Sequence, residues 1–200
     1  MLFRSELAQA LPIVLLDTDS MSLVTGAPEG RRRLLDGTLF HVEQGFLTLW
    51  RRYAHAVRQR NGGLRRGILE ADSAWRHQLA EAGELLTAHR AQMAEQLSDR
   101  LTVLAASLSE DLADVSVQFR RGWDRSLNLA EALERNGQRD SAQGFTQVGP
   151  HRADLRVMVG DVLAADILSR GQMKLLLVAL KRSEEHTSEL QSPCNLVCRL

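Results

Sequence analysis

The feature that most limits how this chain can fold is a long helical pattern between Glu70 and Ser107. Apolar side chains recur there at spacings of seven, four and three residues, at Leu79, Leu86, Met93, Leu97, Leu101, Leu104 and Leu108. Such spacings place side chains on one face of an α-helix. The pattern predicts a single helix whose apolar face is either the seam of an antiparallel coiled-coil arm or a packing face against neighbouring helices.

Short segments outside this helix predict strands and a further helix. Residues 115–119 and 155–159 carry a hydrophobic side chain at every second position, which indicates half-buried strands. The run from Leu11 to Leu16 is a candidate edge or terminal strand, and Phe145 to Val148 is another candidate strand. A short helix is predicted from Leu127 to Asn136.

A helical region is also predicted before the long helix. Pro28 and Glu29 are favourable first residues, because proline needs no hydrogen-bond partner there and the helix dipole stabilises a carboxylate. Helical spacing runs to about Asn61 with a break near His41 to Gly45, and Gly62-Gly63 is expected to end it.

The last predicted helix runs from Ser169 to Arg182, with the Ser169 hydroxyl as its N-cap. The order along the chain is therefore strand, helices, strands and helix. A long helical insertion into a mixed sheet would produce this order. The expected fold class is α/β, with part of a mixed-sheet head and a long helical arm.

The charge is zero overall but uneven along the sequence. Between Glu29 and Arg66 nine arginines stand against three carboxylates, whereas between Glu70 and Arg135 seven arginines stand against twelve. A basic block beside an acidic block is typical of a segment that meets phosphate next to one that does not. It is also the pattern of two solvated helical faces of opposite sign that face each other.

The composition argues against disorder, secretion and membrane insertion. Hydrophobic residues make up 44% and charged residues 25% of the 200 positions. Both cysteines, Cys194 and Cys198, lie near the end, so no disulfide framework is indicated. Because no stretch reaches transmembrane length and the start lacks a signal-peptide pattern, a cytoplasmic protein without membrane contact is expected.

The segment from Leu168 to Gln172 has the clearest chemistry. Ser169 can cap the following helix, Gly171 lets another backbone come close, and the first free N–H groups of the helix can bind a phosphate. Taken alone, this pattern is common and usually only starts a helix.

Several longer segments accompany it in a fixed order. They include Arg31-Arg32-Arg33, Leu35-Asp36, Phe40-His41-Val42-Glu43, Trp50-Arg51-Arg52-Tyr53, Gln59-Arg60-Asn61, Leu133-Glu134-Arg135-Asn136, Gly149-Pro150-His151-Arg152-Ala153-Asp154-Leu155 and Leu168-Ser169-Arg170-Gly171-Gln172-Met173-Lys174. In order and spacing they resemble the RecF family, bacterial DNA-repair ATPases of the SMC/ABC type. The resemblance covers about residues 5–182 and suggests an internal fragment.

The resemblance implies an ABC-type ATPase head that binds ATP with Mg²⁺ between two identical chains, one giving a Walker A motif and the other its signature segment. Ser169, Gly171 and Gln172 would contact phosphate across this homodimer, and Lys174 would either add charge or be an ordinary exposed lysine. Residues 1–27 would be a head strand and turn, 28–112 the helical arm, and 113–182 the return to the head.

The family's function is also implied by the resemblance. Its members bind single- and double-stranded DNA at gaps, act with RecO- and RecR-type mediators, and support RecA loading and the SOS response. Arginines of the basic block then become candidates for sequence-independent contacts to the DNA backbone. They are Arg31, Arg32, Arg33, Arg51, Arg52, Arg58 and Arg60. Some are expected to be solvated or to pair with Asp36 and Glu43.

The sequence also departs from the family. No Gly-Lys pair occurs, so a Walker A motif is absent, and no strand ending in paired carboxylates follows the last helix. We therefore assign no catalytic or metal-binding residue and do not expect these residues alone to hydrolyse ATP. Residues 183–200 leave the family pattern and look like a translated sequencing adapter. The alternative is a natural tail with a metal-binding Cys-x-x-x-Cys, which lacks further ligands at usable spacing.

Two other functions remain open. One is a purely architectural SMC-like coiled-coil protein, and the other is a stand-alone helical DNA-binding module. A Walker A motif upstream of Met1 would favour the RecF interpretation, and a much longer heptad run would favour the architectural one.

Overall fold

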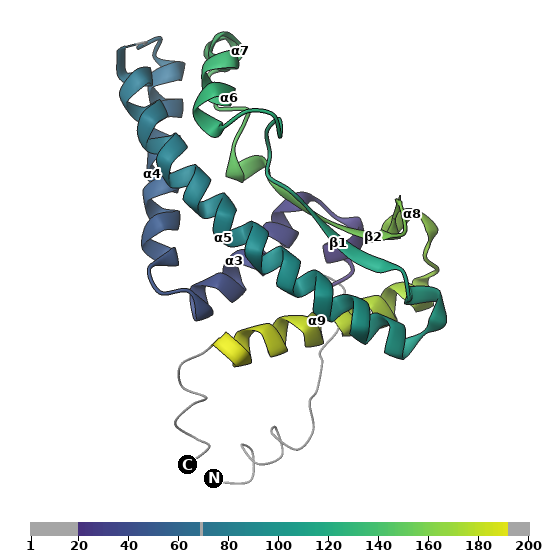
Figure 1. The fold of residues 1–200 in the computed structure, drawn as a ribbon. Helices are drawn as coiled ribbons and strands as arrows, with labels where there is room; N and C mark the ends of the chain where they lie inside the picture. The colour runs from purple at the N-terminus through teal and green to yellow at the C-terminus, as the bar shows by residue number, and fades with distance from the viewer. Residues whose placement is uncertain (1–19, 69, 192–200) are drawn as a thin grey trace, which may run out of the picture.

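The structure, a computed structural model, describes residues 20–68 and 70–191 (Figure 1). Its first half contains α2 (Ser22–Thr25), α3 (Pro28–Val42), α4 (Phe46–Arg65), α5 (Glu70–Leu108), the 3₁₀ turn η1 (Glu110–Leu112) and β1 (Val115–Arg120). Its second half contains α6 (Leu129–Arg135), α7 (Gly137–Gln143), the 3₁₀ turn η2 (Pro150–Arg152), β2 (Asp154–Val159), β3 (Val162–Leu163), α8 (Ala164–Ile167) and α9 (Arg170–Gln191). The strand expected between Leu11 and Leu16 lies outside the described residues.

The described strands form one antiparallel sheet in the order β1-β2-β3. Val117 pairs with Val157 in the register of β1 and β2, which confirms both alternating patterns as strands. The outer edge of β1 is bonded to α5, because the Val117 N–H donates to Ser98 Oγ (2.9 Å) and Thr102 Oγ1 donates to the Val115 carbonyl (2.7 Å). The helix therefore satisfies an edge that would otherwise be open to another strand.

Helices α4 and α5 lie side by side and run in opposite directions (Figure 1). Phe46 at the start of α4 meets His89 of α5, with ring centroids 6.0 Å apart. Further along α4, Arg52 pairs with Glu81 (2.7 Å). Gly83 of α5 allows a close approach, since a Cβ there would lie 2.4 Å from Leu129 Cδ2 and 3.1 Å from Tyr53 Cε2 of α4. The long predicted helix between Glu70 and Ser107 is confirmed.

The predicted end of the preceding helix at Gly62-Gly63 is wrong. Helix α4 continues to Arg65 and ends where Gly67 adopts a left-handed conformation (φ +69°). The Ile68 N–H donates to the Gly63 carbonyl and the Gly67 N–H to the Leu64 carbonyl, which is the hydrogen-bond pattern of a Schellman motif. Glycine inside a helix costs only about 1 kcal/mol, which packing of α4 on α5 offsets.

The candidate strand from Phe145 to Val148 is also wrong. The Thr146 N–H donates to Asn61 Oδ1 (2.8 Å) and the Gln147 N–H to Asp140 Oδ1 (3.0 Å). These backbone groups thus bond to side chains of α4 and α7 rather than to a neighbouring strand. Helix α7, which includes Asp140, was not predicted.

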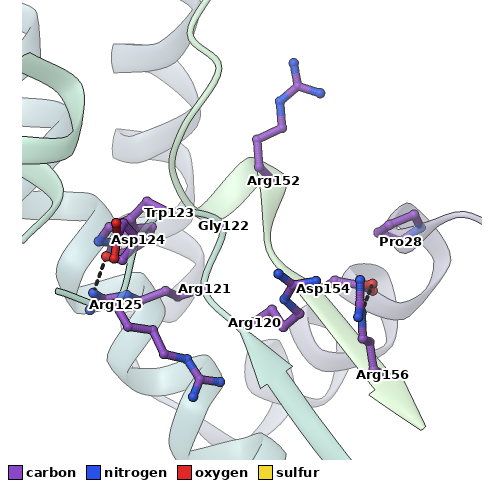
Figure 2. A pocket seen from close by; sticks show the side chains of 10 residues that line it. All are labelled: Pro28, Arg120, Arg121, Gly122, Trp123, Asp124, Arg125, Arg152, Asp154 and Arg156. Atoms are coloured by element: carbon purple, nitrogen blue, oxygen red, sulfur yellow. Dashed lines mark hydrogen bonds and ion pairs between the residues drawn. The ribbon is translucent and has the colours of Figure 1, made fainter. Parts of the chain in front are cut away.

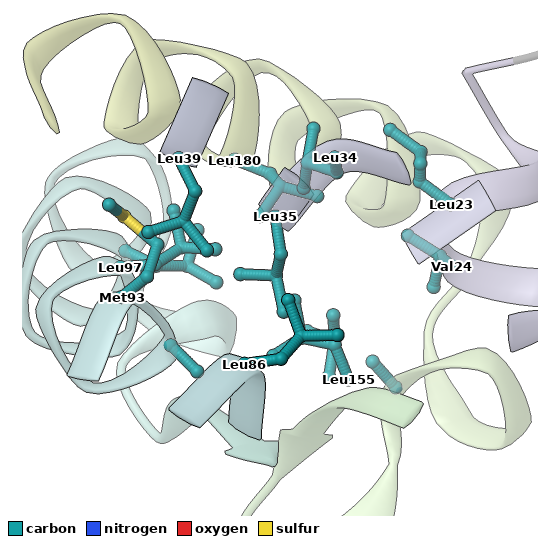
Figure 3. Packing of buried hydrophobic residues seen from close by; sticks show 14 of the residues in the cluster. Leu23, Val24, Leu34, Leu35, Leu39, Leu86, Met93, Leu97, Leu155 and Leu180 are labelled. Atoms are coloured by element: carbon teal, nitrogen blue, oxygen red, sulfur yellow. The ribbon is translucent and has the colours of Figure 1, made fainter. Parts of the chain in front are cut away.

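The core lies where α5 crosses α3, β2 and α9 (Figure 3). Leu86, Met93 and Leu97 of α5 pack there with Leu35, and Leu79 and Leu101 of α5 are also buried. By contrast, Leu108 at the end of the seven-residue pattern is 41% exposed. The apolar face of α5 is therefore mainly a packing face against several elements.

Candidate functional site

The beginning of α9 is held by a reciprocal pair of hydrogen bonds. The Gln172 N–H donates to Ser169 Oγ (3.3 Å) and the Ser169 N–H donates to Gln172 Oε1 (2.9 Å). This is a capping box, so the predicted N-cap role of Ser169 is confirmed. Gln172 also donates through Nε2 to Asp111 Oδ2 (2.8 Å), which ties the start of α9 to η1.

This helix end presents small and polar groups to solvent. Ser169, Gly171 and Lys174 are exposed, whereas Leu168 and Met173 are buried and fix the segment to the core. A Cβ on Gly171 would meet nothing closer than Ser169 Oγ at 4.0 Å. The hydroxyl and the free N–H groups of a first helical turn can donate to phosphate oxygens. The four predicted signature residues are thus brought together, three of them at the surface.

The arginines of α3 occupy three different environments. Arg31 is buried, with Nε on Asp154 Oδ1 (2.8 Å) and Nη1 on the Gly26 carbonyl (2.8 Å). Arg32 donates to the Ala153 carbonyl (2.8 Å). Its pKa is lowered, mainly by partial burial and to a smaller extent by the nearby positive charge of Arg90. Only Arg33 is exposed, and it pairs with Glu29. The helix therefore gives one arginine to solvent.

The arginines of α4 divide in a similar way. Arg51, Arg52 and Arg58 are exposed, and Arg52 pairs with Glu81. Arg60 is buried between Asp140 Oδ2 (2.6 Å) and Thr146 Oγ1 (2.8 Å). The structure thus brings Arg51, Arg52 and Arg58 to the surface of α4, while Arg60 joins α4 to α7.

The carboxylates expected to neutralise these arginines have other neighbours. Asp36 forms a two-pronged pair with Arg90 of α5, with Nε to Oδ1 and Nη2 to Oδ2 both at 2.8 Å. Glu43 lies 3.9 Å from His89. The close partners of both carboxylates are therefore side chains of α5 and not any of the seven candidate arginines, although Asp36 lies in the same hollow as Arg32, Arg33 and Arg58.

A buried network surrounds the return from the helices to β2. Tyr53 Oη lies 2.7 Å from His151 Nδ1, and His151 Nε2 lies 2.9 Å from the Thr146 carbonyl. Because a carbonyl only accepts, the proton of the neutral imidazole sits on Nε2 and Nδ1 accepts from Tyr53. Gly149 is left-handed (φ +130°), and a Cβ there would lie 2.8 Å from Tyr53 Oη.

Burial sets the protonation states in this network. It raises the pKa of Tyr53, which stays a phenol, and it lowers the pKa of His151 to about 4, aided by the charges of Arg152, Arg32 and Arg90. No carboxylate or nucleophile among the groups bonded to His151 could use it as a base. His151 is thus a structural residue that links Tyr53 of α4 to the Thr146 carbonyl.

A cleft that the sequence analysis missed lies at the edge of the sheet where β1 ends and β2 begins. Its volume is about 770 Å³ and it is lined by Arg120, Arg121, Arg125, Arg152 and Arg156, with Asp124 and Asp154 (Figure 2). We call it the arginine cleft. The run Arg120-Arg121-Gly122-Trp123-Asp124-Arg125 is its signal in the sequence. A charge count over residues 70–135 hides that run, because the acidic side chains of α5 outweigh it.

Metal binding and membrane insertion find no support in the described residues. These residues contain no group of three or more His, Cys, Asp or Glu side chains placed to hold a metal ion. None of their helices has the length and apolar character needed to cross a bilayer.

The chain is similar to bacterial proteins described as DNA replication and repair protein RecF. It is 42% identical over 185 residues to the one from Stutzerimonas stutzeri, covering 91% of this chain and 50% of that protein. It is 44% identical over 190 residues to the one from Stenotrophomonas maltophilia, covering 92% and 51%. The chain belongs to the RecF family. It spans about half the length of the curated RecF proteins it matches.

Solved structures agree with RecF membership at the level of the fold. "Structure of the recombination mediator protein RecF-ATP in RecFOR pathway" matches with a TM-score of 0.78 and 20% identity, over 89% of this chain and 51% of that one. A second RecF structure, described with ATPrS, matches with a TM-score of 0.77 over 90% of this chain. The predicted α/β fold, part of an ABC-type head with a long helical insertion, is confirmed, although the described sheet is antiparallel rather than mixed. No protein-family model matches the sequence.

Proposed function

We propose that this chain is part of an ATP-dependent DNA-binding protein of recombinational repair and replication. The observation that carries the proposal is the exposed, capped start of α9 at Ser169, in a chain whose RecF relatives are more than 40% identical. In this proposal the protein binds single- and double-stranded DNA at gaps in the cytoplasm. It acts with RecO- and RecR-type mediators and supports RecA loading and the SOS response.

The start of α9 would act on ATP held by a second copy of the protein. The Ser169 hydroxyl and the first N–H groups of α9 donate to phosphate, and Gly171 leaves room for it. Gln172 orients Ser169 through the capping box, and Lys174 adds positive charge one turn later. ATP with Mg²⁺ supplies the phosphate that joins the two copies. The described residues offer hydrogen-bond donors for the phosphate but no cluster of side chains that could bind the metal ion.

The DNA-binding arginines are a subset of the seven candidates. Arg33, Arg51, Arg52 and Arg58 reach solvent and suit contacts to phosphates. Arg31 and Arg60 are buried in ion pairs, and Arg32 bonds to the backbone before β2. We assign the first four to DNA and the other three to the fold.

The test is ATP-dependent dimerisation of the complete protein to which these 200 residues belong in this proposal. Its molar mass is measured by light scattering with and without ATP and Mg²⁺. Ser169→Asp keeps a side-chain acceptor for the helix cap but repels phosphate, so the ATP-induced dimer should weaken at least tenfold. Gly171→Ala has free space in the monomer and should fold normally, yet it should also weaken the dimer.

Ser141→Asp, on an exposed side chain of α7, is the matched control and should dimerise like the unchanged protein. A protein that stays monomeric with ATP, or variants that dimerise normally, would contradict the proposal. An architectural coiled-coil protein is disfavoured by α5, since Leu86, Met93 and Leu97 face the core rather than a second chain. That alternative also predicts a dimer that forms equally well without ATP.

A further inference from the structure

We propose that the arginine cleft binds the phosphodiester backbone of DNA, as a surface separate from the exposed arginines of α3 and α4. The inference rests on the DNA-binding function proposed above and names a further site for it. It begins with the position of the cleft, where two stretches of chain are held together. The Gly149 N–H donates to the Gly122 carbonyl (3.2 Å), which brings residues 150–152 beside residues 121–125.

The strand register gathers the arginines of the sheet at the same place. Arg120 is the last residue of β1 and lies opposite Asp154, the first residue of β2. Arg156 follows on β2, opposite Gln118 of β1. Arg120 and Arg156 therefore come from the ladder itself, whereas Arg121, Arg125 and Arg152 come from the two stretches beyond it. The ladder holds Arg120 and Arg156, and the hydrogen bond between Gly149 and Gly122 holds the other two stretches together.

The two carboxylates in the cleft have other partners. Asp154 accepts from Arg31 Nε and from the Leu155 N–H, both at 2.8 Å, and lies 3.7 Å from Arg156 Nε. Asp124 Oδ1 accepts from the Ser126 N–H (2.9 Å) and hydroxyl (2.8 Å), and these bonds lower the pKa of Asp124. Within the described residues, neither carboxylate forms an ion pair with Arg120, Arg125 or Arg152.

Three arginines are consequently available to a ligand. Arg120, Arg125 and Arg152 are exposed, and within residues 20–68 and 70–191 none of them forms an ion pair. Five arginines against two aspartates also leave the cleft with a net charge of +3. An uncompensated cluster of guanidinium groups is the usual electrostatic footprint of a phosphate-binding surface.

The side chain of Arg121 bonds to its own loop and is not free to meet a ligand. Its Nη2 donates to the carbonyls of Asp124 (2.6 Å) and Leu127 (2.8 Å), and its guanidinium lies 4.8 Å from the centre of the Trp123 ring. These contacts fix the loop that carries Arg125. Arg121 therefore positions the cleft while Arg120, Arg125 and Arg152 meet the ligand.

The arrangement suits an extended chain of phosphates better than a single nucleotide. Arg152 and Arg125 extend in opposite directions with Arg120 between them, so the groups spread rather than converge (Figure 2). Gly122 does not form a phosphate cradle. Its backbone is left-handed (φ +95°) and packs against residues 149–153, so that a Cβ added there would lie 2.3 Å from the Gly149 carbonyl oxygen. Trp123 is buried and bonded to Leu127, so it gives no surface for a base to stack on. Contacts to phosphates without contacts to bases indicate duplex DNA read through its backbone.

The experiment measures binding of the full-length product to fluorescently labelled duplex DNA by anisotropy over a series of salt concentrations. Each phosphate contact contributes roughly 0.9 to the slope of log K against log salt for duplex DNA. The triple variant Arg120→Gln, Arg125→Gln, Arg152→Gln should therefore flatten the slope by up to about 2.7 and weaken binding more than tenfold at low salt. Because all three side chains are exposed, its melting temperature should stay close to that of the unchanged protein.

The matched control is Arg135→Gln with Arg139→Gln, two exposed arginines of α6 and α7 outside the cleft, which should leave the slope nearly unchanged. If the unchanged protein binds DNA and the triple variant keeps its slope, the cleft assignment is wrong and the proposed function stands. If the unchanged protein binds no DNA, both fail. Displacement of DNA by micromolar ATP, lost in the triple variant, would show a nucleotide pocket and overturn the assignment to DNA.

Discussion

At the scale of single residues, buried arginines hold the helices of this molecule together. The side chains of Arg60 and Asp140 have no solvent-exposed surface, and their pair connects α4 to α7 at 2.6 Å. Arg90 does the same between α5 and α3 through Asp36, and it also bonds to the Pro150 carbonyl at 2.7 Å. Removing one partner of such a pair leaves an uncompensated charge in the interior.

Asp140→Asn should therefore lower the free energy of unfolding by about 3–5 kcal/mol, as measured by urea denaturation. Its matched control is Glu29→Gln, which breaks the exposed pair with Arg33 and should cost less than about 1 kcal/mol. Under conditions where both variants are folded, neither should change the salt dependence of DNA binding. A flatter salt slope in a folded Arg60→Gln variant would return Arg60 to the DNA-binding set.

His151 should give the fold a measurable pH dependence. Burial lowers its folded pKa to about 4 from the ordinary histidine value of 6.5, so between these values the unfolded chain binds the extra proton. The free energy of unfolding should then fall as pH falls from 6.5 towards 4, by up to about 1.4 kcal/mol per pH unit. Well above pH 6.5, where the imidazole is neutral in both states, this group should contribute no slope. His151→Gln should remove that part of the pH dependence, as measured by urea unfolding at pH 7.5, 6 and 5. If the free energies of unfolding of the two proteins differ by the same amount at all three pH values, His151 is not the source of the dependence.

At the scale of elements, the end of α4 shows what a glycine does in two settings. Gly62 lies inside the helix, and a Cβ there would meet only Arg66 Nη2 at 3.7 Å. Gly67 closes the helix in a left-handed conformation. Gly62→Ala should raise the free energy of unfolding by up to about 1 kcal/mol through helix propensity, whereas Gly67→Ala should lower it by about 1 kcal/mol through backbone strain. Thermal melts of the two single variants test this pair, and equal signs would contradict it.

Periodicity along the chain was enough to predict the elements that pack by one apolar face. The 39 residues of α5 and the alternating residues of β1 and β2 follow such patterns. Sequence could not predict the segment around Thr146, because its hydrogen bonds go to Asn61 on a helix 85 positions away. It could not separate Arg60 from Arg58 either, since two arginines in one helix differ only by the face on which tertiary packing places them. The start of α9 was predictable, because a capping box needs only local residues.

At the scale of the whole molecule, α5 joins the two parts that the sequence analysis divided at residue 113. Its apolar face packs on α3 and α4 from the predicted arm and on β1 and α9 from the predicted return to the head. Leu35, Leu86, Leu155 and Leu180, drawn from four elements, lie in one cluster (Figure 3). One shared core implies that these parts unfold together.

Leu86 is fully buried at the centre of this cluster, so Leu86→Ala should lower the free energy of unfolding by about 2–5 kcal/mol. The measurement uses two proteins that each keep one tryptophan, Trp50 on α4 or Trp123 after β1, with the others changed to phenylalanine. Their fluorescence midpoints in urea should coincide with each other and with the loss of helical circular dichroism, and Leu86→Ala should shift all three equally. Val103→Ala, at a 71% exposed position on the same helix, should leave them in place. Separate midpoints for Trp50 and Trp123 would instead show that the arm and the head are independent folding units, with α5 belonging to the arm alone.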